Sequence, residues 1–276
     1  MTTDHPIVGC YRGPDSAGAV QLGALLAAAV RQPLVVASAY RYEPMAFSAR
    51  VASTRNDVRF DAAQARVELA ERLVPDGIEV RERVLPAVGV PEALADLARE
   101  VDACALVVGR DLDGDVTRLV LEHAPCPVAV SPLEVPVRGE DPLCTIGVAY
   151  DASPGARFAL AAAVRLAILT DARVKLISIG AGIAETRVDL DPAATSEAVA
   201  VDVVRLDGDP GTRLVEASDA LDLLLCGSHG RGRVLSAVLG SVSGHLVRAA
   251  HCPVLVVPPR IRRRAKAPLG LTTAAG

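Results

Sequence analysis

The 276-residue chain has no tryptophan, and its three phenylalanines and four tyrosines leave an aromatic content of only 3%. The core must therefore be built from Val, Leu, Ile and Ala. Hydrophobic residues make up 51% of the chain, which is enough for a packed core. This composition favours buried parallel strands and closely packed helices over an aromatic-rich β-sandwich. A chain of this length is expected to form one or two domains, and two is the more typical number.

Excess positive charge and long apolar runs are also missing. The formal net charge is −4, so no overall basic field favours nucleic-acid binding. The longest weakly polar run, AVQLGALLAAAV, is shorter than the roughly 18–20 residues of a membrane span and predicts a packed helix. The N-terminal MTTDHP has no positive segment followed by an apolar one, so we expect no secretion signal and a cytoplasmic protein without a membrane partner.

The cysteines do not have the spacing of a disulfide framework or of a zinc site, because none forms a C-x-x-C pair. Most lie within or beside apolar runs, so we expect small buried hydrophobic side chains in a reducing compartment. The six are Cys10, Cys104, Cys126, Cys144, Cys226 and Cys252.

The chain contains an internal repeat. IVGCYRGPDSAGAV resembles TIGVAYDASPGARFAL, CALVVG resembles LLLCG, and HAPCPVAVSP resembles AAHCPVLVVPP, in the same order. We therefore predict two tandem domains, residues 1–134 (the first half) and 143–260 (the second half), joined by the proline-rich SPLEVPVRGEDP. The basic tail 261–276 is expected to be disordered, and contact with nucleic acid or another anionic partner is the alternative.

Apolar strands alternate with helical patterns in each half. In the second half we expect strands over 145–150, 172–179, 199–206, 221–227 and 253–258, and helices over 155–170, 210–220 and roughly 236–250. The stretch 181–199 is ambiguous, and its helix is expected to be short or absent. Together these patterns predict a Rossmann-like, doubly wound α/β fold: two three-layer (α/β/α) domains, each with a mostly parallel five-stranded sheet.

Unusual chemistry follows the fourth strand of the second half, in GSHGRGRVLSAVLGS. In a doubly wound sheet, ligands bind beyond the carboxyl ends of the strands, where the strand order reverses. A loop that enters a helix there directs backbone N–H groups and the helix dipole at one point, and glycines let the backbone approach a ligand closely. Neither G-x-x-x-x-G-K-S/T nor G-x-G-x-x-G is present in this loop. The loop favours a phosphate-bearing ligand, with Arg231 and Arg233 at its rim; a flexible surface loop is the alternative.

The spacing of Gly227, Gly230, Gly240 and Ser241 resembles the G-x2-G-x9-G-S/T nucleotide signature of the universal stress protein family. CGSHGRG…LGSVSGHLVRAAHCPVLVVP is similar to that family's final third, and VAYDASPGARFAL to its first strand and turn. The resemblance covers most of the second half and, more loosely, the first. It implies a tandem two-domain universal stress protein of the adenine nucleotide alpha hydrolase-like fold, acting in stress response.

The resemblance further implies that the second half binds ATP or another adenine nucleotide as a regulatory ligand, with Mg²⁺ as a candidate partner of the phosphates. Asp151 would bind the ribose or the adenine, and Ala149 and Ile179 would meet the base. A one-residue shift would give the place of Ile179 to Ser178 or Gly180. The loop glycines would line the ribose and phosphates, and residues 240–243 would hold the phosphates through N–H and hydroxyl groups. The implied site residues are Ala149, Asp151, Ile179, Gly227, Gly230, Gly240, Ser241, Val242 and Ser243.

For Asp151 the alternative is a turn or helix-capping role. The first half lacks the site, because alignment puts Arg12 at the place of Asp151, and a cation cannot accept hydrogen bonds from a ribose. Its loop is eight residues shorter and carries three aspartates that would repel phosphate: Asp111, Asp113 and Asp115. A calcium loop is the alternative for these aspartates, although the remaining ligands are missing. We therefore expect one nucleotide per chain.

No catalytic or metal site is expected. The sequence has no G-x-S-x-G elbow and no H-E-x-x-H. Ser228 and His229 are sequence neighbours without an identifiable third group, and His245 and His251 lie six residues apart, off a common helical face. The alternative function is a weak ATPase or another nucleotide-hydrolysing enzyme of the same fold. A third interpretation is a scaffold whose loop serves only dimerisation.

The apolar last strand of each half has a further implication, because such strands tend to pair across a two-fold axis in this family. Residues 127–131 and 253–257 are expected to pair as an internal pseudo-dimer. A homodimer of the whole chain is a second candidate assembly.

Overall fold

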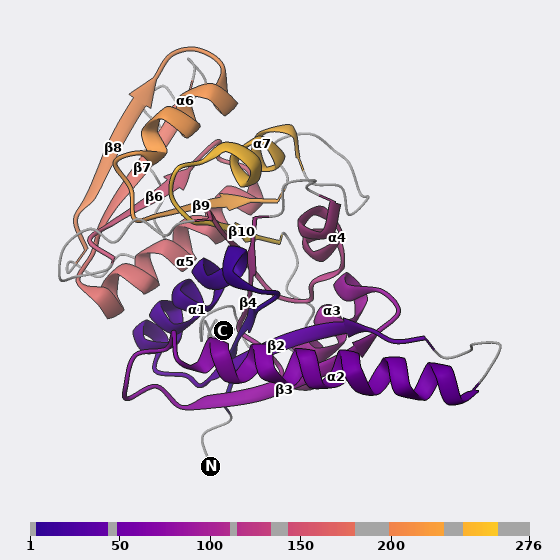
Figure 1. Ribbon diagram of the computed structural model, residues 1–276. Helices are drawn as coiled ribbons and strands as arrows, with labels where there is room; N and C mark the ends of the chain where they lie inside the picture. Colours follow the sequence, from indigo (N-terminus) through magenta and orange to yellow (C-terminus); the bar gives the residue numbers. More distant parts are fainter. Residues whose placement is uncertain are drawn as a thin grey trace, which may run out of the picture.

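The computed structural model describes residues 4–43, 49–110, 115–133, 143–179, 199–228 and 240–258. Within these ranges, ten strands form one continuous sheet in the order β3-β2-β1-β4-β5-β10-β9-β6-β7-β8 (Figure 1). The order repeats outward from the central pair, so each half contributes the same five-strand arrangement. The predicted linker and tail lie largely or wholly outside the described residues, as does most of the ambiguous stretch 181–199.

Strands within a half pair only in parallel, as the apolar strand sequences predict. The first half supplies β1 (Ile7–Cys10), β2 (Leu34–Arg41), β3 (Val80–Ala87), β4 (Ala105–Gly109) and β5 (Val128–Ser131). The second half supplies β6 (Thr145–Ala149), β7 (Arg173–Ile179), β8 (Val201–Leu206), β9 (Leu223–Gly227) and β10 (Val254–Val257). The doubly wound α/β prediction is confirmed.

One antiparallel pair, β5 with β10, joins the two halves. Val254 lies opposite Val130 and Val256 opposite Val128, and both strands are buried along their whole length. The expected pairing of residues 127–131 with 253–257 is therefore present. Because each strand covers the other's edge, neither half leaves an open apolar edge at this side.

The helices form two layers, one on each face of the sheet. The first half contains the short 3-10 helix η1 (Pro14–Ser16), α1 (Ala17–Val30), α2 (Ala49–Glu71), α3 (Val90–Glu100) and α4 (Asp115–His123). The second half contains α5 (Pro154–Thr170), α6 (Pro210–Ser218) and α7 (Ser241–Ala249). Buried residues of α1, α2 and α5 share one core cluster, and those of α3, α4, α6 and α7 share the other, which gives the three predicted layers.

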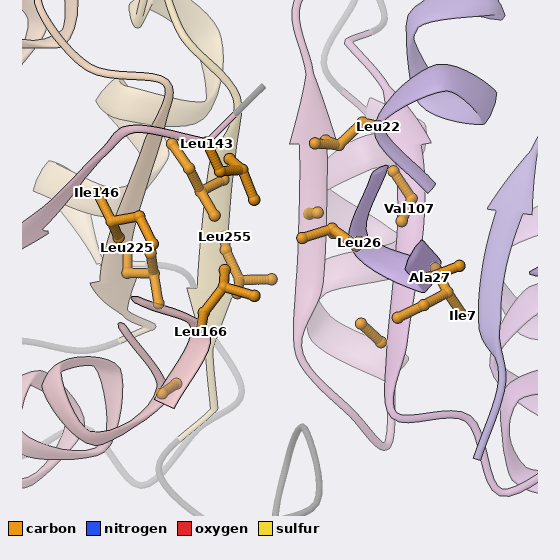
Figure 2. Packing of buried hydrophobic residues seen from close by; sticks show 14 of the residues in the cluster. Ile7, Leu22, Leu26, Ala27, Val107, Leu143, Ile146, Leu166, Leu225 and Leu255 are labelled. Carbon is orange, nitrogen blue, oxygen red and sulfur yellow. The ribbon is translucent and has the colours of Figure 1, made fainter. Parts of the chain in front are cut away.

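The core follows the composition. Ile7 and Val107 of the sheet pack with Leu26 and Ala27 of α1 (Figure 2). Alternate strand residues face the two clusters, as the two-residue period of a strand requires. Among the described residues the buried core includes a single aromatic side chain, Tyr11. Within the same ranges, no helix combines the length and apolarity needed to cross a membrane.

Two details differ from the sequence-based expectations. Helix α7 begins at Ser241 rather than near 236, because Gly240 is an extended N-cap with φ −62° and ψ 156°; residues 236–239 lie outside the described ranges. Five of the cysteines are buried, but Cys144 is exposed. Cys144 directly precedes β6, where its N–H donates to the carboxylate of Asp222 at 2.9 Å. None of the six cysteines takes part in a disulfide.

Candidate functional site

The strand order of the second half reverses at β6, which lies between β7 and β9. Connections from β6 and β9 therefore diverge to opposite faces, and this is where doubly wound sheets bind ligands. We call this place the β6/β9 edge: Ala149 at the end of β6, Gly227 at the end of β9, and the residues that follow each. Ile179 ends the neighbouring β7, two residues beyond Ile177, the partner of Ala149 in the ladder.

The turn after β6 places Asp151 at this edge. Oδ1 of Asp151 accepts from the N–H of Ser153 at 3.0 Å, and Oγ of Ser153 accepts from the N–H of Ala156 at 3.2 Å as the N-cap of α5. The turn role considered for Asp151 is thus present. Ala152 has φ 62°, a left-handed conformation that few non-glycine residues adopt. Serine before proline at a helix start is a capping signature, so the sequence contained a signal for Ser153.

Gly227 brings β9 directly against the start of α5. A Cβ at this position would lie 2.8 Å from the carbonyl carbon of Gly155, 2.9 Å from its Cα and 3.1 Å from the nitrogen of Ala156. These are backbone atoms that cannot rotate away, so packing alone requires glycine here. One consequence is that the N-terminus of α5 lies beside the end of β9.

The N-terminus of α7 lies beside the same strand end. Gly240 supplies no side-chain cap, and the first helical bond runs from the N–H of Gly244 to the carbonyl of Gly240 at 2.8 Å. The N–H groups of Ser241, Val242 and Ser243 therefore have no acceptor within the helix. No acidic side chain lies in the first turn. This helix end presents three N–H groups that have no acceptor within the helix, together with the positive end of the dipole.

Ser243 ties α7 to β9. Ser243 is 4% exposed, and its hydroxyl lies 3.2 Å from the carbonyl oxygen of Ser228 and 3.1 Å from that of Gly240. The N–H of Gly240 donates to the same Ser228 carbonyl at 2.9 Å. A hydroxyl has one hydrogen, so this one serves the main chain. Of the two donors of Ser243, the N–H rather than the hydroxyl is then the one that we expect to meet a ligand.

Part of the predicted site is outside the described residues. The structure brings together Ala149, Asp151, Gly227 and the start of α7, with Ile179 on the adjacent strand. Gly230 lies outside the described ranges, together with His229 and both loop arginines. Beside Gly227, burial raises the pKa of the Cys226 thiol to about 12, so this thiol is not a nucleophile at neutral pH.

In the corresponding turn of the first half, the side chain of Ser16 takes up backbone donors. The N–H groups of Tyr11 and Tyr150 make the same bond to the neighbouring strand, at 2.8 and 2.9 Å, so Arg12 stands where the second half has Asp151. Oγ of Ser16 accepts from the N–H of Arg12 at 2.7 Å and from that of the following glycine at 3.2 Å. The donors of this turn are therefore used within the chain.

The loop after β4 also differs. Residues 110–114 join β4 to α4, whereas 228–240 join β9 to α7. Asp115 occupies the first turn of α4, where its carboxylate offsets the helix dipole that would attract phosphate. Asp111 and Asp113 lie outside the described residues. Within the described part of the chain, no group of three or more His, Cys, Asp and Glu side chains is arranged to hold a metal ion.

The strand order and the two helix N-termini at one strand end define a doubly wound α/β protein built from two related halves. The family model described as the universal stress protein family matches residues 181–258. Universal stress protein Rv2005c of Mycobacterium tuberculosis is 27% identical over 284 residues, which cover 91% of this chain and 95% of that protein. Residues 181–258 thus match the universal stress protein family, and the similarity to its members extends over most of the chain.

A solved structure that aligns with nearly the whole chain shows the same fold in both halves. The crystal structure of a universal stress protein from Archaeoglobus fulgidus covers 92% of this chain and 96% of its own, with a TM-score of 0.66 and 17% identity. A universal stress protein solved in complex with cAMP covers 47% of this chain, with a TM-score of 0.34 and 21% identity.

Proposed function

We propose that the second half binds one molecule of ATP or another adenine nucleotide at the β6/β9 edge, as a regulatory ligand. The start of α7 carries the proposal. Three consecutive N–H groups there have no acceptor in the helix, no acidic side chain competes for them, and Ser243 fixes them beside β9. The N-terminus of α5 lies at the same strand end, so two helix dipoles favour an anion there.

The nucleoside would lie on the β6 side of this edge. Asp151 is oriented by the N–H of Ser153. A carboxylate accepts about four hydrogen bonds, so Asp151 retains the capacity to accept from ribose hydroxyls. Ala149 would contact the base, and the backbone of Ile179 would meet its polar edge.

The phosphates would lie on the α7 side. The N–H groups of Ser241, Val242 and Ser243 would bind their oxygens, and Gly227, Gly230 and Gly240 would let the backbone approach. Mg²⁺ would be held by the phosphates themselves, because the described residues offer no cluster of metal ligands.

The first half (1–134) would support the nucleotide-binding second half (143–260) without binding nucleotide itself. Ser16 uses the donors of its turn, and Asp115 offsets the dipole of α4. The β5–β10 pair would hold the two halves as an internal pseudo-dimer.

Thermal denaturation with ATP, ADP, AMP and cAMP tests this function. A ligand at 100 times its dissociation constant adds about 2.7 kcal/mol of stability. Asp151→Asn should reduce the shift strongly, because it removes the charged acceptor for the ribose. Asp171→Asn is the matched control at the other end of α5, where φ is 55° and asparagine is tolerated. No shift with any of the four nucleotides, or equal shifts for both variants, would refute the proposal.

Hydrolysis on the same samples tests the enzymatic alternative. A regulatory ligand should survive stoichiometric incubation, since the described part of the site offers no activating base. Many turnovers per bound nucleotide would instead favour the ATPase.

A further inference from the structure

Arg110 connects the two halves at the end of the second half's sheet opposite the proposed site, where α7 ends and β10 begins. It directly follows β4, and its N–H donates to the carbonyl of Ser131 on β5 at 2.8 Å. Its side chain then leaves the first half: Nη2 donates to the carbonyl oxygen of Ala250, a residue 140 positions away in the chain. Ala250 is the C-cap of α7.

This contact is suited to holding the end of a helix. Ala250 leaves the helix with an extended backbone (φ −60°, ψ 144°), so its carbonyl has no partner within the helix, and Arg110 supplies a donor to it. The Arg110 side chain is partly buried, and burial lowers the pKa of the guanidinium, which nevertheless remains charged at neutral pH. The bond is therefore sheltered from competing water.

Helix α7 has nine residues, so its two ends are only about 13 Å apart. One end carries the N–H groups of Ser241, Val242 and Ser243, and the other is held by Arg110. A short helix moves as one body, so a change at its C-terminal carbonyl alters the direction of its N-terminal donors.

The equivalent arrangement in the first half does not cross between halves. Arg99 of α3 donates from Nη2 to the carbonyl of His123, the last residue of α4, at 3.1 Å. Ser228 occupies the place of Arg110 in the second half, as its N–H bond to the last strand of that half shows, and serine is too short to span to α4. Among the described residues, α7 of the second half is thus held at its C-terminal end by an arginine of the other half, whereas α4 is held by an arginine of its own half.

We propose that Arg110 is a positioning residue for the phosphate end of the nucleotide site, through which the first half sets the orientation of α7. The inference rests on the proposed function. It also limits where the effect falls: the nucleoside contacts of Asp151 and of β6 and β7 do not involve α7. Arg110 should therefore matter for ATP and not for adenosine.

Calorimetric titrations of the full chain with ATP and with adenosine test this. Arg110→Met should weaken ATP binding by up to roughly tenfold, the limit reached if the whole free energy of the lost charged hydrogen bond appears in binding, and change adenosine binding by less than about twofold. Arg99→Met is the matched control, since it releases α4 and should change neither affinity. Arg110→Lys keeps a cationic donor and should recover part of the lost ATP affinity.

Hydrogen exchange of the nucleotide-free protein supplies a second readout. Arg110→Met should speed exchange of the α7 amides while α4 stays protected, and Arg99→Met should do the reverse. If wild-type protein binds ATP and Arg110→Met binds it equally well, or loses ATP and adenosine affinity alike, the positioning role is refuted while the proposed function stands. Unchanged α7 exchange in Arg110→Met would also refute it. If wild-type protein binds no ATP, the proposed function fails, and this inference fails with it.

Discussion

Gly227→Ala perturbs the close approach of β9 to α5. The added methyl would lie 2.8–3.1 Å from backbone atoms of Gly155 and Ala156, so either the strand end or the helix must shift. The matched position in the first half is Gly109, where a methyl would meet the Cβ and Cα of Ser16 at 3.3 and 3.4 Å. Neither glycine has φ in the left-handed region, so alanine is accessible to the backbone at both.

The expected costs differ accordingly. Overpacking against fixed backbone costs about 2 kcal/mol, in the middle of the range for such changes. At Gly109 the contacts are tighter than usual by only a few tenths of an ångström. Replacing glycine by alanine also lowers the conformational entropy of the unfolded protein, which offsets roughly 0.4–1 kcal/mol of this destabilisation at each site. Gly227→Ala should therefore be destabilised by about 1–2 kcal/mol, and Gly109→Ala by less than about 0.5 kcal/mol.

Urea denaturation monitored by far-UV circular dichroism measures both variants. The midpoint of Gly227→Ala should fall clearly below that of wild type, and its ATP affinity should fall as well, because the N-terminus of α5 is displaced. Equal stability of the two variants would show that Gly227 is not required by packing.

Three further predictions concern other described residues. Asp222→Ala should cost about 2 kcal/mol in urea denaturation, because the Asp222 carboxylate accepts two backbone N–H groups at the start of β6, at 2.9 and 2.8 Å; a loss below 0.5 kcal/mol would contradict this. Hydrogen bonds from the N–H of Thr212 and, to a smaller extent, from its hydroxyl lower the pKa of the Asp209 carboxyl. The stability that this carboxylate contributes is therefore fully present above its usual pKa of 3.8 and is lost as the pH falls through its lower pKa in the folded state. Wild type should accordingly lose more stability than Asp209→Asn between pH 5 and pH 2, and parallel acid profiles would refute the assignment. A thiol reagent should label one cysteine quickly in the native protein, and Cys144→Ser should remove that phase, since the other five thiols are buried; several fast phases would show that the sheet opens.

Much of the fold could be predicted from the sequence, because burial on both faces leaves a direct signature in a strand. Runs such as LDLLLC have no polar alternation, and the internal repeat placed equivalent strands in both halves. The start of α7 could not be predicted, because SAVLG continues a helical pattern. What sets the boundary is the N–H of Gly240, which bonds to the carbonyl of Ser228, a tertiary contact with no local signal.

The candidate site was predictable in outline only. Glycine spacing and the exchange of Asp151 for Arg12 predicted which half binds a ligand, and those assignments stay predictions. The hydrogen bonds that Ser16 accepts in the turn after β1 could not be predicted, because a serine near a helix start has many potential partners. Arg110 was invisible for a different reason: its partner is defined only once β5 pairs with β10 and brings the halves together.

Calorimetric titration of the full chain with ATP tests the central claim most directly. We expect a stoichiometry of one per chain, abolished by Asp151→Arg, which gives the second half the residue that the first half has at this position. Arg12→Asp should not create a second site, because Ser16 still occupies the donors of that turn. Two equivalent sites, or unchanged affinity in Asp151→Arg, would contradict the account.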